Sequence, residues 1–205
     1  MAKNGNTILN LNKLAINGSN SKDRIVYSHK DIKDFVVHCK GLGLKVVLVQ
    51  GTWDMVHIGH ARYLEEAKRA GDILIVGVDS DKKVRHRKGP DRPVVPQDER
   101  LEMLTHLRPV DLVVLKELKD PKWALIKTVQ PDVLIAIQEN YTKDQIKKLK
   151  AHCKVVKILP RQATTSTSAK LRLLQINVAQ KLGKAITPKL VHTIESALED
   201  LKNGN

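Results

Sequence analysis

The feature that most constrains this chain is a series of five short apolar runs separated by segments with helical patterns. The runs occupy residues 45–50, 73–78, 111–115, 132–137 and 155–159 and are rich in Val, Ile and Leu. Continuous apolar runs of this length indicate strands that are buried on both faces, as in parallel sheets covered by helices. The sequence therefore predicts the α/β class, with a doubly wound five-stranded parallel sheet.

Helix signals fill the segments between these runs. Ser28 with Asp31 forms a capping-box pattern for a first helix, which Gly41 and Gly43 end. Further helices are expected over 59–69 and 96–106, from Asp120 with Pro121 at the first helical position, and from Thr142 with Gln145. We expect a flexible N-terminal tail over 1–27, an α/β domain over 28–175 and a helical C-terminal extension over 176–205, with a helix start at Thr187–Pro188.

Composition narrows the range of partners. The formal net charge is +14, which predicts attraction to polyanions, while only 3% of residues are aromatic. So few stacking platforms weigh against single-stranded nucleic acid as the partner, although nucleic acid stays open. Cys39 and Cys153 lack metal-ligand or CxxC spacing, which indicates reduced thiols. No apolar run has membrane-spanning length. These features predict a cytoplasmic protein with no membrane contact.

The segment directly after the first strand favours an anion site. It reads Gln-Gly-Thr-Trp-Asp-Met-Val-His-Ile-Gly-His over residues 50–60, and a helix follows at once. A loop that enters a helix offers free backbone N–H groups and the positive end of the helix dipole. His57 and His60 are three positions apart and can face the same phosphate, and Gly59 between them leaves the backbone accessible.

This segment resembles the first motif of the cytidylyltransferase-like nucleotidyltransferases, G-T/C-F-D-x-x-H-x-G-H, with Trp53 in place of the aromatic Phe. The resemblance implies a Rossmann-like nucleotidyltransferase fold over the 28–175 domain and catalytic roles for His57 and His60. It also implies nucleotide contacts from Gly51, Thr52, Trp53, Asp54 and Gly59. Asp54 is expected to orient neighbouring groups or to contact a metal ion. Two surface histidines on an ordinary helix are the alternative reading.

A basic segment after the second strand extends the resemblance. Residues 84–90, followed by Arg-Pro-Val at 92–94, are similar to the basic loop of heptose-1-phosphate adenylyltransferases, which implies a catalytic role for Lys88 on the triphosphate. Arg100 matches a family arginine near the nucleotide phosphates. Arg108 resembles the arginine of an Arg–Asp pair in glycerol-phosphate cytidylyltransferases and is expected to bind substrate. A solvated loop and two structural ion pairs are the alternatives.

A hydroxyl-rich segment follows the fifth strand, over residues 160–169. Hydroxyl groups and free amides at a helix start can bind phosphate. The segment resembles the family's closing motif R-T-x-G-I-S-T-S/T, apart from Thr164 where glycine is usual. The resemblance implies phosphate contacts from Arg161, Thr165, Ser166, Thr167 and Ser168; a low-complexity linker is the alternative.

The chain departs from the resemblance after the fourth strand. Relatives place a glycine and one or two aspartates there, whereas this chain has Ile137, Gln138 and Glu139. Ile137 and Glu139 are therefore expected to contact the acceptor or the base, and the acceptor is left open.

Taken together, the resemblance implies transfer of a nucleoside monophosphate from ATP or CTP to a phosphorylated small molecule, with Mg²⁺ as cofactor and a homodimer as the assembly. The basic segment favours ATP and a heptose-type sugar 1-phosphate, handled by a stand-alone transferase. The alternatives are a glycerol-3-phosphate cytidylyltransferase, an archaeal-type FAD synthetase, and a nucleotide-binding or RNA-binding module without turnover.

Overall fold

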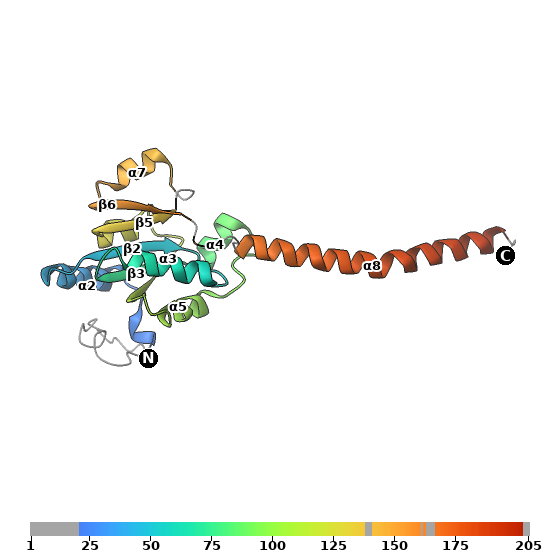
Figure 1. Ribbon diagram of the computed structural model, residues 1–205, viewed down its shortest axis with the longest axis horizontal. Coiled ribbons are helices and arrows are strands. Elements are labelled where there is room, and N and C mark those ends of the chain that lie inside the picture. The colour runs from blue at the N-terminus through green and yellow to red at the C-terminus, as the bar shows by residue number, and fades with distance from the viewer. Residues whose placement is uncertain (1–20, 138–140, 161, 163–166, 203–205) are drawn as a thin grey trace. The chain divides into compact units, whose positions relative to one another are not determined.

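The computed structural model describes residues 21–137, 141–160, 162 and 167–202 of the chain (Figure 1). The chain divides into two compact units, Met1–Thr164 and Thr165–Asn205. The first unit holds the sheet and seven of the described helical segments, and the second holds a single long helix, α8 (Thr167–Lys202).

The first unit is built on a six-stranded sheet in which every pairing is parallel. Its strand order is β1-β4-β3-β2-β5-β6. The strands are β1 (Ile25–Val26), β2 (Val46–Gly51), β3 (Ile73–Asp79), β4 (Leu112–Lys116), β5 (Val133–Ile137) and β6 (Val155–Leu159). The five predicted strands and the α/β class are thereby confirmed.

The sixth strand, β1, lies in the range that the sequence predicts as a flexible tail, so that expectation is wrong for the residues just before 27. A short 3-10 helix, η1 (Ser21–Arg24), leads into β1, and Ile25 pairs with Val113 of β4. The Arg24 guanidinium anchors the segment by donating to the backbone oxygens of Val110, at 3.0 Å, and Thr105. Two apolar residues are too few to produce a recognisable strand pattern, and only the contact with β4 specifies them.

Helices cover both faces of the sheet, as a doubly wound fold requires. The helices are α2 (His29–Gly41), α3 (Ile58–Lys68), α4 (Asp81–Lys88), α5 (Gln97–Thr105), α6 (Ala124–Val129) and α7 (Lys143–Leu149). One buried cluster joins α3 and α5 to one face, and a second joins α2, α6 and the end of α7 to the other. Two of the predicted caps are present: the Ser28 hydroxyl accepts from the Asp31 amide, and Thr142 and Gln145 cap each other's backbone N–H.

Three helix boundaries differ from those that the sequence predicts. The helix expected from Asp120 begins at Ala124, because the Asp120 carboxylate instead accepts from the Glu117 amide at 2.7 Å and closes a turn. The segment expected as a basic loop is helical through Lys88. The Ser80 hydroxyl caps the start of this helix, α4, and Gly89, at φ +97°, ends it.

The third difference concerns the C-terminal helix. The expected helix start at Thr187–Pro188 is wrong, since α8 runs through Pro188 from Thr167 and the unit boundary lies before 175. A helix accommodates an internal proline at a cost of about 3 kcal/mol, which the good helix formers on both sides offset. Within the described part of the chain, no helix combines the length and apolar character that crossing a membrane requires.

The strand order places a topological switch point at the centre of the sheet. The chain moves outward from β2 to β3 and β4, then returns to the other side of β2 to form β5 and β6. Ligands of doubly wound sheets bind outside the carboxyl ends of the strands at such a switch point. In this chain the switch point lies between β2 and β5, next to the segment that follows β2.

Candidate active site

Two imidazole rings lie at the first turn of α3, directly beyond the carboxyl end of β2. His57 is the N-cap residue, and its Nδ1 accepts from the Gly59 amide at 3.1 Å. His60 Nδ1 accepts from the His57 amide at 3.3 Å, and the two ring centroids are 4.2 Å apart. Because each Nδ1 acts as an acceptor, the neutral rings carry their protons on Nε2. Both rings therefore lie at the positive end of a helix, where anions bind.

The loop before the histidines is shaped by Trp53, which is buried rather than offered as a stacking surface. Trp53 adopts a left-handed backbone conformation at φ 59°, and its Nε1 donates to the Gly77 carbonyl at 3.0 Å. Its ring meets the edge of the His60 ring at 5.5 Å. A Cβ on Gly51 would lie 3.0 Å from the indole, so glycine relieves a tight contact there. Trp53 in turn packs against His60.

Asp54 connects this loop to the segment after Gly89. Its carboxylate accepts from the Val94 amide at 3.1 Å and the Val95 amide at 3.0 Å, and pairs with Arg92 at 2.8 Å. Burial alone would raise the pKa of Asp54, but the two amides and the Arg92 charge outweigh it and lower that pKa. With its oxygens engaged in this way, Asp54 fits the orienting role better than that of a metal ligand. Among the described residues, no group of three or more His, Cys, Asp or Glu side chains is arranged to hold a metal ion.

Lys88 is the last residue of α4 and is exposed. The residue before it, Arg87, reaches Thr52 Oγ1 at 2.8 Å and Asp79 Oδ2 at 2.9 Å. Thr52 therefore lies next to the basic segment. Its hydroxyl contacts Arg87, and its carbonyl accepts from Arg100.

Arg100 is buried, with 1% of its surface exposed. Its guanidinium donates to the carbonyls of Val95, at 2.9 Å, Thr52, and Asp79, at 2.9 Å, and to the Asp81 carboxylate at 2.8 Å. These bonds tie α5 to the carboxyl ends of β2 and β3. The geometry supports the structural alternative for this residue rather than direct contact with nucleotide phosphates.

The remaining predicted residues fall in three places. Ile137 ends β5 at the carboxyl edge and packs against the cluster on the α3 side of the sheet, so the fold brings it beside the histidine loop. Arg108 is exposed in the connection from α5 into β4, at the amino edge of the sheet, and is not brought to this site. The reason is the direction of the strands. In a parallel sheet, the segment that leads into a strand lies at the edge opposite the carboxyl ends.

The other predicted contacts concern the segments after β5 and β6. Glu139, Arg161, Thr165 and Ser166 lie outside the described residues, and Thr167 and Ser168 are the first two residues of α8.

Sequence reasoning missed three charged residues at this edge: Arg92, Asp79 and Lys116. Asp79 ends β3 and Lys116 ends β4, and their side chains pair at 2.9 Å. A signal for both was present, because each is a charged residue that closes an otherwise apolar strand.

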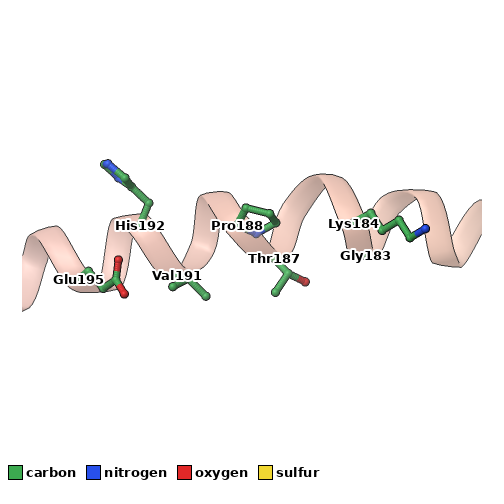
Figure 2. A pocket seen from close by; sticks show the side chains of 7 residues that line it. All are labelled: Gly183, Lys184, Thr187, Pro188, Val191, His192 and Glu195. Atoms are coloured by element: carbon green, nitrogen blue, oxygen red, sulfur yellow. The ribbon is translucent and has the colours of Figure 1, made fainter.

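A separate hollow lies on α8 and involves none of the predicted site residues. Figure 2 shows its lining, which comes from one helix around Pro188: Gly183, Lys184, Thr187, Pro188, Val191, His192 and Glu195. The hollow is therefore a feature of the helix surface rather than part of the histidine site.

Comparison with known proteins places this geometry in a family. The profile described as "Cytidylyltransferase-like" matches residues 48–193. The bifunctional protein HldE of Aliarcobacter butzleri is 35% identical over 159 residues, which are 77% of this chain and 33% of that protein. The HldE protein of Nitratiruptor sp. is 44% identical over 109 residues, 52% of this chain and 23% of that protein. The chain thus spans about a third or less of the length of these relatives.

Solved structures agree with the fold. A lipopolysaccharide core biosynthesis protein from Thermoplasma volcanium superposes with a TM-score of 0.50 and 29% identity, covering 57% of this chain and 98% of that one. A pantoate-beta-alanine ligase from Francisella tularensis shares the fold at a TM-score of 0.52 and 17% identity, with 70% of this chain and 68% of that one covered. The profile matches most of the sequence, including the histidine-bearing loop after β2. The chain therefore belongs to the cytidylyltransferase-like family.

Proposed function

We propose that this protein is a nucleotidyltransferase that joins a nucleoside monophosphate, taken from a nucleoside triphosphate, to a phosphorylated small molecule. The observation that carries the proposal is the His57–His60 pair at the start of α3, whose Nδ1 atoms both accept backbone N–H groups. That arrangement fixes two imidazole rings beyond the carboxyl end of β2, next to the switch point between β2 and β5 where this type of sheet binds ligands. Membership of the family supports the same reaction class.

In this mechanism, an oxygen of the acceptor's phosphate forms a bond to the α-phosphorus of the triphosphate. The bond from that phosphorus to the bridging oxygen breaks, and pyrophosphate leaves. His57 and His60 donate to phosphate oxygens, on which charge develops in the transition state, and the amides at the start of α3 add to this stabilisation. Lys88 neutralises the triphosphate as a mobile cation. A Mg²⁺ ion bound to the triphosphate would supply further charge neutralisation.

The substrates proposed are ATP and a heptose-type sugar 1-phosphate. Support comes from the basic segment that ends α4 and from the HldE proteins among the relatives. A homodimer is the proposed assembly, and the two buried free cysteines fit a cytoplasmic location. Glycerol-3-phosphate cytidylyltransferase and FAD synthetase are alternatives, because Ile137 stands where relatives have glycine.

The test is a pyrophosphate-release screen of ATP and CTP against heptose 1-phosphate, glycerol 3-phosphate and FMN. The proposal expects the highest kcat/KM for ATP with heptose 1-phosphate. A higher kcat/KM for another nucleotide and acceptor would support nucleotidyl transfer but show that the proposed substrates are wrong. Saturable nucleotide binding without pyrophosphate release from any pair would instead establish a binding module without turnover.

A further inference from the structure

The short basic segment at the end of α4 is held by two buried carboxylates that come from different strand ends. Arg87, Lys88 and Arg92 surround Gly89, whose φ of +97° turns the chain out of the helix. Each arginine forms an ion pair with an aspartate, whereas Lys88 lies between the two anchored positions.

The first anchor is Asp79, the last residue of β3, which is 1% exposed. Its two carboxylate oxygens meet two cations: Lys116 Nζ lies 2.9 Å from Oδ1, and Arg87 lies 2.9 Å from Oδ2. Arg87 also donates to Thr52 Oγ1 at 2.8 Å. One guanidinium therefore joins α4 to the end of β3 and to the loop that carries the two histidines.

The second anchor is Asp54 in that same loop. Arg92 approaches Asp54 Oδ2 through two of its nitrogens, at 2.8 and 3.0 Å, and the Val94 and Val95 amides complete the site. Side-chain exposures of 15% for Arg92 and 2% for Asp54 show that this pair is well removed from solvent. Ion pairs of this kind lose little to screening and fix geometry more firmly than surface pairs.

Lys88 experiences the charges of both anchors. Desolvation by the surrounding protein, followed by the positive charges of Arg87 and Arg92, lowers the pKa of Lys88, and the negative charges of Asp79 and Asp54 act in the opposite direction. The ammonium group therefore lies within electrostatic reach of both anchored ion pairs.

We propose that Arg87 and Arg92 are positioning residues that hold Lys88 towards the anion site, by tying both sides of the Gly89 turn to the buried carboxylates of Asp79 and Asp54. The proposal rests on the nucleotidyltransferase function and explains how Lys88 is positioned for it. Neither arginine needs to touch the substrate; each acts through Lys88.

A double-mutant cycle with Lys88 tests this. Arg87→Ala should lower kcat for nucleotidyl transfer by up to about 100-fold, the scale of a misplaced reacting group. In the Lys88→Ala background the same substitution should change kcat by less than about twofold, because its target is gone. Arg85→Ala is the matched control: it removes the same charge from the same helix, and Arg85 is exposed and pairs with Asp81 at 3.9 Å. Independent, multiplying losses from Arg87→Ala and Lys88→Ala would overturn the positioning role.

A second measurement does not depend on turnover. The pH dependence of amine labelling at Lys88, followed by mass spectrometry in the ligand-free protein, reports its pKa. Arg87→Ala removes a neighbouring positive charge and should raise that pKa, whereas Arg85→Ala should leave it unchanged. An unchanged labelling profile in Arg87→Ala would refute the proposal even in an active enzyme. Failure of the wild type to release pyrophosphate would count against the proposed function and leave the labelling result intact.

Discussion

At the residue scale, the two ring nitrogens of His57 act differently. Nδ1 caps the start of α3, and Nε2 carries the proton of the neutral ring. The Gly59 amide bonds to Nδ1, which fixes the ring and gives Nε2 the proton in the neutral form. The capping bond is a structural role, and the proposed contact with phosphate is a second role for the same side chain.

Separating these duties gives a first prediction. His57→Asn and His57→Ala should each lower kcat by about 10²–10³, the cost of losing one transition-state donor. Asparagine is a good N-cap and alanine is a poor one, so only His57→Ala should also lose about 0.5–2 kcal/mol of folding stability. Steady-state pyrophosphate release and thermal unfolding measure the two effects. A fully active His57→Asn protein would remove the imidazole from the mechanism.

Asp54 provides a pH-dependent prediction. Its pKa is lowered on folding, so it stabilises the fold at pH values above the unfolded pKa of about 3.9, and this contribution disappears as the pH falls through the folded pKa. At pH 7, Asp54→Asn should be less stable than the wild type by about 1–3 kcal/mol. Denaturant unfolding of both proteins between pH 7 and 3 should show the gap closing only at the acid end. A gap that stays constant over the whole range would mean that the Asp54 charge is not what holds residues 92–95.

At the scale of secondary structure, α5 is attached to the sheet by apolar packing and by the hydrogen bonds of one buried arginine, Arg100. Arg100→Met should remove the donors for three carbonyls and a carboxylate and cost about 3–5 kcal/mol, the range for breaking a buried charge network. The control Arg69→Met removes an exposed arginine with surface pairs only, worth less than about 1 kcal/mol. Chemical denaturation compares the two. An Arg100→Met protein of normal stability with a raised KM for ATP would restore the phosphate-binding role that the motif implies.

The end of β5 determines a further prediction, about specificity. Ile137 packs at the carboxyl edge beside the histidine loop, where a branched side chain narrows the space available to base or acceptor. Ile137→Gly should widen tolerance without abolishing transfer, while Ile137→Val should behave like the wild type. The measurement is kcat/KM for ATP and CTP, each with heptose 1-phosphate and glycerol 3-phosphate. Equal ratios in all three proteins would show that position 137 does not face the substrates.

At the scale of the whole molecule, the second unit is the helix α8, whose apolar side chains are exposed in the described part of the chain. Leu174, Val178, Leu182, Ile186, Leu190, Ile194 and Leu198 recur every four residues, and all are more than half exposed. A spacing of four exceeds the 3.6 residues of a helical turn, so the row winds around α8. Basic Lys181, Lys184 and Lys189 precede acidic Glu195 and Glu199. Two antiparallel copies would therefore match opposite charges while covering both rows.

The expected consequence is a homodimer that depends on α8. Leu182→Lys combined with Leu190→Lys should convert the dimer to a monomer, measured by sedimentation velocity, because two charges would have to be buried in an apolar contact. Gln180→Lys combined with Thr193→Lys adds the same charge to the same helix at polar, exposed positions and should leave the dimer intact. If the wild type sediments as a monomer, or the leucine variant as a dimer, α8 has another role.

The sequence alone determined whatever depends on neighbours in the chain. Apolar runs revealed the five main strands, Ser28 and Thr142 marked helix starts, and His57 and His60 follow the central strand directly. These signals are local, because they arise from periodicity, caps and the residues that follow a strand. The fold class and the position of the two histidines at a helix start could therefore be predicted from the sequence.

Only the tertiary structure decided which charged groups meet. Arg87 contacts Thr52 across 35 positions of sequence, and Arg100 reaches the Thr52 carbonyl across 48. Nothing in the local sequence therefore shows whether such an arginine forms buried structural hydrogen bonds or binds phosphate. The same holds for β1, whose two residues become a strand only beside β4, and for Arg108, which the direction of β4 places at the opposite edge. Partners, edges and burial follow from strand order, which is a property of the packed molecule.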